Sequence, residues 1–326
     1  MMLRALLLLI QCMYIAGYSQ SNSFRWSNLP NLSCVSTSEG DVSTSDIFSL
    51  DSIRSTLIRQ EETIIFALIE RAQYRRNYDI YDAKKNNLRN VYGAPLSFLE
   101  WMLIETEKLH AKVRRYTSPE EHAFYEELLP LPILSEIQFP QLLVVNKSDV
   151  NVNAEIMRWY TGKIVDRLAI AGDDEQHGSS VLCDINALQS ISRRIHFGKF
   201  VAESKFLQDP DAYTNLVRQR DARGILQLLT NVEVERGVLR RAFVKASRYG
   251  QDIKGTEPAD TKKIDPMLIV DIYRDMIIPL TKDVEVRYLF HRLGAAPPSP
   301  DTYYEHCRGP LDAFEGGEMA KLVENS

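Results

Sequence analysis

Apolar residues recur at helical spacing along most of the chain after residue 49. In the first such segment they include Ile53, Leu57, Ile64 and Leu68, which lie on one side of an α-helix. Six further segments show the same amphipathic period, which is typical of helices that bury one stripe. Together the segments cover residues 50–74, 97–116, 153–169, 181–206, 211–229, 234–249 and 266–293. Because no comparable series of alternating strands occurs, the pattern predicts an all-α protein.

Turn-forming residues separate these segments, among them Pro130, Pro132 and Pro140. No polar linker divides the segments into two groups, so we expect a single helical-bundle domain over residues 50–293, although 326 residues would suffice for two domains. Residues 20–49 are rich in Ser and Asn and predict a flexible leader. Residues 294–326 begin with a Pro-containing stretch and lack a helical stripe, so we expect a flexible tail there.

The first 19 residues have the layout of a secretory signal peptide. A basic residue, Arg4, precedes an apolar run over 5–16, and small residues precede Gln20. The run is shorter than the roughly 20 residues that span a bilayer, so we expect no membrane association after signal removal. The predicted location is the secretory pathway or the extracellular space. A plastid transit peptide is an alternative because no acidic residue precedes Glu39, and the cytoplasm is a third location.

Composition excludes several classes of function. Lys and Arg number 39 against 44 Asp and Glu, and the resulting net charge of −5 argues against nucleic acid as a partner. The four cysteines contain no C-x-x-C pair and the six histidines show no ligand spacing, so we predict no metal site. A P-loop, a dinucleotide-binding glycine motif and an H-E-x-x-H motif are also absent from the sequence.

Polar residues inside otherwise apolar helices are the remaining candidates for chemistry. Arg194 and Lys205 are 11 residues apart, which returns nearly to the same helix face at about 100° per residue. Two further pairs are spaced by four residues and share a face: Asn231 with Glu235, and Thr281 with Glu285. Spacing alone favours solvated surface pairs, because most charges on helices are solvated.

One segment resembles a known family. Residues 192–206, SRRIHFGKFVAESKF, are similar to the signature segment of the all-helical chorismate mutases of plants and fungi. Supporting matches lie at 53–61, 64–66, 70–71, 109–116, 118–120 and 278–286, so the resemblance covers residues 50–293. It implies an all-α homodimer that converts chorismate to prephenate by an intramolecular Claisen rearrangement, without a cofactor, in phenylalanine and tyrosine biosynthesis.

The resemblance also implies roles for individual residues. Arg54 and Arg194 would bind the two carboxylates of chorismate, and Lys205 would reach its ether oxygen. Glu285 would face that oxygen as a neutral acid with a raised pKa, although an ion pair with Lys282 one turn earlier is the structural alternative. Glu235 would accept from the ring hydroxyl. Two residues would complete the polar lining, namely Asn231 and Thr281.

An effector site is implied as well. Many members of this family are activated by tryptophan and inhibited by tyrosine at a site between subunits, so the resemblance implies tryptophan and tyrosine as effectors. The matching residues are Arg114 and Arg115, with Gly178 and Ser179 in the loop before the signature helix. An amino-acid carboxylate suits an arginine, and a glycine lets backbone amides approach a ligand. A solvated basic helix end is the alternative for the arginine pair.

Two other functions remain open from the sequence. One is a catalytically inactive helical protein on the same scaffold, which binds an aromatic amino acid or a protein partner. Loss of Arg194, Lys205 or Glu285 would favour this alternative, and all three are present. The other is a secreted mutase that acts outside the producing cell, which only the N-terminus supports.

Overall fold

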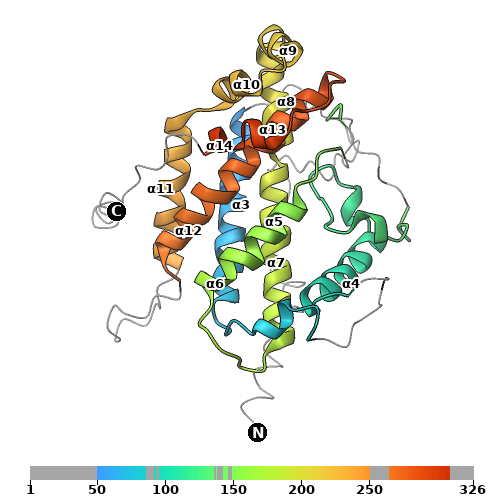
Figure 1. Ribbon diagram of the computed structural model, residues 1–326, viewed down its shortest axis with the longest axis vertical. Coiled ribbons are helices and arrows are strands. Elements are labelled where there is room, and N and C mark those ends of the chain that lie inside the picture. Colours follow the sequence, from blue (N-terminus) through green and yellow to red (C-terminus); the bar gives the residue numbers. More distant parts are fainter. Residues whose placement is uncertain are drawn as a thin grey trace, which may run out of the picture. The chain divides into compact units, whose positions relative to one another are not determined.

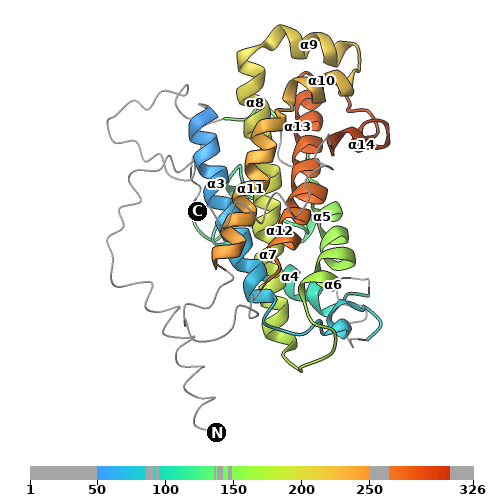
Figure 2. The same cartoon turned by 90° about the vertical axis from the view of Figure 1, so that its left-hand side faces the viewer.

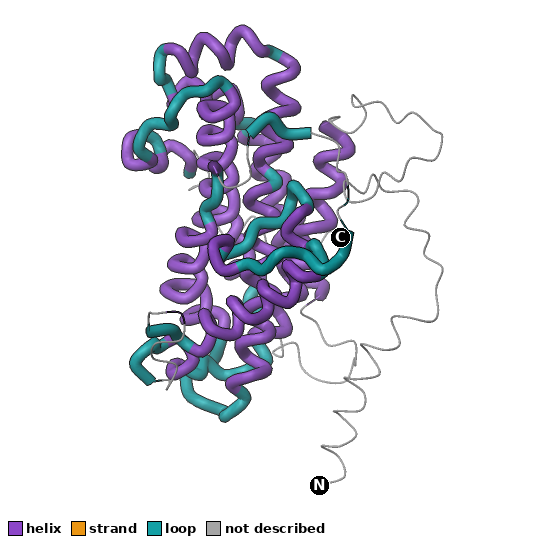
Figure 3. Tube along the Cα trace, turned by 90° about the vertical axis from the view of Figure 1, so that its right-hand side faces the viewer, coloured by secondary structure: helices purple, strands orange, loops and turns teal. Residues whose placement is uncertain are grey.

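The computed structural model describes residues 50–85, 92, 95–135, 137, 142–145, 149–249 and 264–308, all within one compact unit. These residues form helices and loops, with no strand among them (Figure 3). The prediction of an all-α protein is therefore confirmed. None of the described helices combines the length and the apolarity that a bilayer crossing requires. The predicted signal peptide and leader lie outside the described residues.

Two long helices pack against each other, with α7 (His177–His196) inside the bundle and α3 (Leu50–Arg71) on one side of it, as Figures 1 and 2 show. The other described helices are α4 Phe98–Lys112, α5 Asn153–Trp159, α6 Val165–Leu168, α8 Gly198–Gln208, α9 Pro210–Arg218, α10 Ala222–Leu229, α11 Val232–Tyr249, α12 Pro266–Ile272, α13 Ile278–Arg292 and α14 Tyr304–Cys307. Short π-helical turns join α5 to α6 over Tyr160–Ile164 and α12 to α13 over Tyr273–Ile277.

Two of the expected helices are divided. The segment 181–206 breaks at Phe197, between α7 and α8. The segment 211–229 breaks before Asp221, whose carboxylate accepts from the Gly224 backbone N–H at 2.9 Å and so starts α10 anew. Arg220 there has a φ of 55°, outside the helical region.

The apolar core has two parts. The larger cluster gathers residues of α3, α4, α7, α11 and α12, including Leu68, Leu188 and Ile269. The smaller cluster joins α8, α9, α10 and α13 to the segment after Leu293, because Tyr303 and Cys307 are buried in it. The expectation of a flexible tail is therefore wrong for this segment, whose apolar side chains pack on α13. Residues 309–326 lie outside the described part of the chain.

A buried polar network fixes the start of α7. Asn77 is fully buried with a φ of 51°, a left-handed conformation that Asn tolerates. Its side-chain amide donates to Asp174 Oδ1 at 2.9 Å and to Ser180 Oγ at 2.8 Å. One turn further along α7, Asp184 accepts from Arg71 Nε at 2.7 Å. The network thus ties the end of α3 to the first turns of α7.

Candidate active site

Arg194 lies in the last turn of α7 and is almost completely buried, with 6% of its surface exposed. Burial lowers the pKa of its guanidinium, while Tyr273, Glu61 and Glu285 act in the opposite direction. Its Nε is buried without a hydrogen-bond partner among the residues that the structure describes. A buried donor of this kind is costly unless a ligand accepts from it, so the guanidinium has capacity for an anion.

Lys205 follows on α8, after the break at Phe197. Its side chain is half-buried, and its Nζ donates to the backbone carbonyl of Leu229 at the end of α10. The expectation that Arg194 and Lys205 share one helix face was made for an unbroken helix. The structure places them on consecutive helices, yet both act on the carboxyl of Glu285.

α13 supplies the acid of the cluster. Glu285 is 6% exposed, and burial raises the pKa of its carboxyl. Lys205, Lys282 and Arg194 oppose this rise in the pKa, and the carboxylate of Glu235 adds to it. The raised pKa favours the protonated form of Glu285 to a higher pH than for an exposed glutamate.

A close helix contact holds α8 against α13. A Cβ added at Gly198 would lie 3.0 Å from both Cγ2 and the carbonyl oxygen of Thr281, and 3.3 Å from Cγ of Glu285. A larger residue would require the two helices to move apart by a few tenths of an ångström, so glycine favours this approach. Thr281 is buried, and its hydroxyl donates to the carbonyl of Ile277 at 2.6 Å.

Lys282 links α13 to α11. Its Nζ lies 2.7 Å from Oε1 of Glu235. Lys282 therefore forms its ion pair with Glu235, and not with Glu285 as the structural alternative proposed. Oε2 of Glu235 is buried and has no hydrogen-bond partner among the described residues. Glu235 thus offers one acceptor oxygen within the cluster.

The two other predicted catalytic residues are both exposed. Asn231 is exposed just before α11, where its Oδ1 accepts from the Val234 backbone N–H at 3.1 Å. This contact is that of a helix N-cap. Arg54 is exposed on α3, so the structure does not bury it with the cluster.

The structure adds one buried carboxylate that the sequence analysis left without a role. Glu61 is fully buried in α3 and forms ion pairs with Arg241 at 2.8 Å and Lys245 at 3.2 Å. A signal was present, because Glu61 falls four residues after Leu57 and three before Ile64, on the apolar stripe of the helix. A charged residue on the buried stripe of a helix indicates a buried ion pair, because buried carboxylates almost always have a partner.

The cluster can perform noncovalent chemistry on an anion. Arg194, Lys205 and Lys282 face two carboxyl groups, of which Glu285 is shifted toward its neutral form. This leaves a surplus of positive charge in a region of low dielectric, where it acts strongly. Among the described residues, no group of three His, Cys, Asp or Glu side chains could hold a metal ion.

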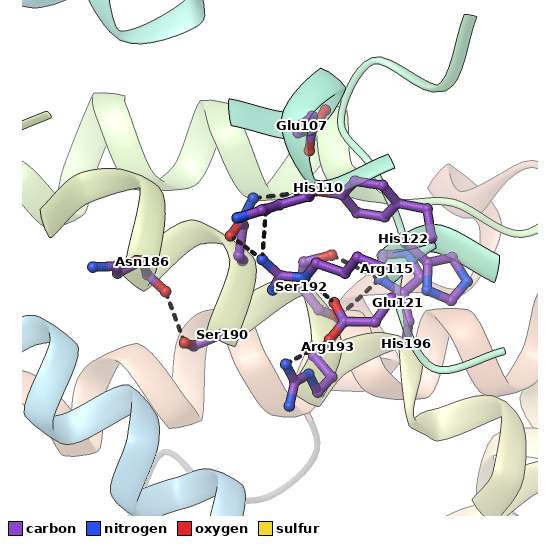
Figure 4. Close-up of polar contacts among 12 residues, drawn as sticks. Glu107, His110, Arg115, Glu121, His122, Asn186, Ser190, Ser192, Arg193 and His196 are labelled. Carbon is purple, nitrogen blue, oxygen red and sulfur yellow. Dashed lines mark hydrogen bonds and ion pairs between the residues drawn. The ribbon is translucent and has the colours of Figure 1, made fainter. Parts of the chain in front are cut away.

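The candidate effector arginines follow the end of α4, and Figure 4 shows the contacts of Arg115. Arg115 donates to Gln189 Oε1 at 2.7 Å, contacts His110 Nδ1 at 2.9 Å, and pairs with Glu121 at 3.2 Å. Arg114 adopts a left-handed conformation, with a φ of 68°, and donates to the carbonyl of Ser135. The pair therefore makes specific contacts rather than forming a wholly solvated helix end.

Gly178 and Ser179 lie elsewhere on the same chain. Both are in the first turn of α7, so their expected position in a loop before the helix is wrong. Ser179 precedes Gln189, the contact of Arg115, by ten residues, or roughly 15 Å along a helix. One chain alone therefore does not bring the two halves of the predicted effector site together.

Comparisons with known proteins agree with this site. Residues 179–286 match the chorismate mutase type II family. The chain is 46% identical over 256 residues to chloroplastic chorismate mutase 3 of Arabidopsis thaliana, covering 77% of this chain and 80% of that protein. The crystal structure of chorismate mutase from Candida albicans in complex with L-Trp has a TM-score of 0.72 and 40% identity, over 82% of this chain and 100% of that one. A structure of AtCM1 with tyrosine in its allosteric site has a TM-score of 0.66 and 42% identity, over 76% and 98%. With this identity sustained over most of both chains, and with an all-helical bundle in common, the chain belongs to the chorismate mutase family and is an isomerase.

Proposed function

We propose that the cluster around Arg194, Lys205 and Glu285 is where this enzyme rearranges chorismate to prephenate. The observation that carries the proposal is the buried carboxyl of Glu285, whose pKa is raised although three cations surround it. Such a group supplies a neutral hydrogen-bond donor among positive charges. A dianion that develops further negative charge at one oxygen is the substrate that this combination suits.

The reaction asks for positioning and electrostatics alone. In the Claisen rearrangement the ether bond breaks as a carbon–carbon bond forms within the same molecule, so no nucleophile takes part. The enzyme has to hold a flexible dianion in a compact, reactive conformer. It also has to stabilise the charge that develops on the ether oxygen.

Each side chain then has a role that its chemistry fits. The planar guanidinium of Arg194 binds one carboxylate with two hydrogen bonds, and Arg54 binds the other at the margin. Lys205 exchanges the Leu229 carbonyl for the ether oxygen. Protonated Glu285 donates to the same oxygen from the opposite side.

The hydroxyl of the substrate ring requires an acceptor. Glu235 fits this role because Lys282 holds one of its oxygens and the other has no partner among the described residues. Asn231 and Thr281 complete the polar lining, at the start of α11 and on the inner face of α13.

Alanine variants test the proposal. Arg194→Ala and Lys205→Ala should each lower kcat/KM by about a hundredfold or more, because each removes a cation from the site. Arg218→Ala is the matched control, since Arg218 is exposed at the end of α9. Chorismate loss and prephenate formation are followed together with circular dichroism. Near-normal turnover in either site variant would overturn the assignment, and a folded parent protein without activity would favour the inactive binding protein.

We further propose that two copies of the chain form a homodimer with shared effector sites. Arg114 and Arg115 would meet the partner subunit's Gly178 and Ser179 around an amino acid. The relatives that bind tryptophan and tyrosine support this proposal. Arg115 is linked to α7 through Gln189, and its partner Glu121 also pairs with Arg193, the neighbour of Arg194, at 2.5 Å.

Equilibrium binding of tryptophan and tyrosine tests the effector proposal. Gly178 is exposed, and a Cβ there meets nothing within 4 Å, so substitution leaves the fold intact. Gly178→Asp should abolish binding because its carboxylate repels that of the ligand, whereas Gly178→Ala should retain it. Absence of binding to the parent protein would contradict the proposal.

The cellular setting follows from the substrate and the N-terminus. We propose a role in aromatic amino acid biosynthesis, with residues 1–19 directing the chain into the secretory pathway. The plastid alternative has the support of the Arabidopsis relative, whose name places it in the chloroplast. Residues 1–49 fused to a fluorescent protein would separate the two locations, and cytoplasmic fluorescence would contradict both.

A further inference from the structure

We propose that residues 300–307, named here the C-terminal strut, position the catalytic helix α13. The strut consists of a 3₁₀ turn over Pro300–Thr302, then Tyr303, then α14. It lies beside α10 and α13 (Figure 2). None of its residues contacts the proposed substrate site, so its action has to pass through the helices that it holds. The inference rests on the site proposed above.

The first anchor of the strut is a buried hydrogen bond to α13. Tyr303 is 1% exposed, and its hydroxyl donates to Oδ1 of Asp283 at 2.6 Å. Asp283 is equally buried and also binds Arg287 one turn later, with Nη2 at 2.6 Å from Oδ2. Burial raises the pKa of Asp283, while Arg287 and Tyr303 favour its charged form. A buried carboxylate keeps its place only while such partners remain.

Asp283 is well placed to transmit a displacement. It lies two residues after Thr281 and two before Glu285, a rotation of roughly 200° from each, so it occupies the opposite side of α13. The strut therefore holds the back of α13 while Thr281 and Glu285 occupy the front. A shift or rotation of α13 at Asp283 moves Glu285 with it, because a helix of 15 residues moves as a unit.

The second anchor of the strut is a pair of hydrogen bonds to α10. Arg223 on α10 donates to the carbonyl of Thr302, with Nε at 3.4 Å and Nη2 at 3.3 Å. α10 ends at Leu229, whose carbonyl accepts from Lys205, and α11 with Glu235 begins three residues later. Cys307 and Tyr303 share an apolar cluster with Leu226 of α10 and Leu289 of α13. The strut thus connects α13, which carries Glu285, to α10, whose last carbonyl binds Lys205.

The expected effect is a loss of turnover. A misplacement of about 1 Å at a reacting centre costs up to a hundredfold in rate, so release of one anchor should lower kcat by about tenfold. KM should change by less than about twofold, because Arg194 and Lys205 do not depend on the Asp283 contact.

Two neighbouring tyrosines provide a matched test. Tyr303→Phe removes the donor to Asp283 and keeps the aromatic ring. Tyr304→Phe is the control, because the Tyr304 hydroxyl has no hydrogen-bond partner among the described residues. Both variants are assayed well below their Tm. The proposal expects the drop in kcat in Tyr303→Phe alone, and a smaller drop in Arg223→Ala than in Tyr303→Phe, with Arg218→Ala unchanged.

The outcomes separate the strut from the site. Parental kcat in Tyr303→Phe together with a lowered Tm would mean that the strut only stabilises the fold, which overturns the proposal. If Tyr303→Phe fails to fold, Arg223→Ala decides: a kcat equal to that of Arg218→Ala overturns it. Retained activity in Arg194→Ala would instead refute the active site on which the strut depends.

Discussion

At the scale of single residues, the proposed role of Glu285 predicts that its environment sets the pH range of the enzyme. Burial raises the pKa of this carboxyl against the combined effect of Lys205, Lys282 and Arg194. In the proposed mechanism only the protonated form can donate to the ether oxygen, since an ionised carboxylate accepts hydrogen bonds and donates none. Activity therefore depends on a proton that Glu285 loses as the pH rises.

Glu285→Gln should make activity independent of this proton. In the parent enzyme kcat/KM should fall tenfold per pH unit once the pH exceeds the raised pKa, because the acid form disappears. The amide of Gln still donates at every pH. The variant should therefore be less active than the parent at acidic pH, and its kcat/KM should not fall as the pH becomes alkaline. Profiles of kcat/KM at constant ionic strength measure this. Equal alkaline slopes in both proteins would contradict the role of Glu285.

Residue identities were easier to predict than residue partners. The resemblance indicated Arg194, Lys205 and Glu285, and the structure brings all three into one cluster. The ion pair of Lys282 with Glu235 was not predictable, because it depends on how α11 and α13 are rotated against each other. Helical periodicity indicates the buried face of each helix separately and contains no information on that relative rotation.

At the scale of helices, one glycine controls the approach of α8 to α13. Gly198 lies at the start of α8, against Thr281 and Glu285. The sequence showed a glycine inside an otherwise helical segment, which is a weak sign of close packing. The structure supplies the partner helix and the distance.

Gly198→Ala should destabilise the enzyme by about 1–3 kcal/mol, because the added methyl group lies within 3.0 Å of the Thr281 backbone oxygen. Gly162→Ala is the control: a Cβ there meets nothing within 4 Å, so this variant should be unchanged or slightly more stable. Urea unfolding measures both free energies. Equal midpoints for the two variants would show that α8 and α13 separate without cost.

Helix boundaries were partly predictable. Asp221 is a visible capping residue before α10, and Asp209 with Pro210 caps α9. The break at Phe197 had only a weak signal, the adjacent Gly198, because a single glycine is also tolerated inside helices. The burial of Tyr303 and Cys307 was missed because the segment after Leu293 is too short and too irregular for a periodic stripe.

At the scale of the whole molecule, a buried acid on α4 should make stability depend on pH. Glu107 is fully buried, and its carboxyl accepts from the backbone N–H groups of Phe124 at 2.8 Å and Tyr125 at 3.1 Å. Burial raises its pKa to about 7. An exposed glutamate in the unfolded chain has a pKa of about 4.3.

The free energy of unfolding should therefore fall as the pH rises from about 4.3 to 7, because the folded state binds more protons than the unfolded state in that range. The slope from this one group is at most about 1.4 kcal/mol per pH unit, and it vanishes above pH of about 7. Glu107→Gln should lack this component. Urea unfolding at pH 5 and pH 7 measures the difference, and an identical pH dependence in the variant would contradict the shift.

The hydrogen bonds of Asn77 have a consequence for the order of folding. Asn77 is 97 positions before Asp174 and 103 positions before Ser180 in the sequence. The hydrogen bonds within each helix, in contrast, join residues that are close in sequence. Contacts between distant residues form late, since the entropy of closing a long loop has to be overcome before they contribute. The first turn of α7 therefore reaches its final position against the end of α3 only when most of the chain between them is in place. An amino acid that binds at Gly178 and Ser179 would then bind only molecules that have completed folding. Its apparent affinity would therefore report the fraction of fully folded molecules in the sample.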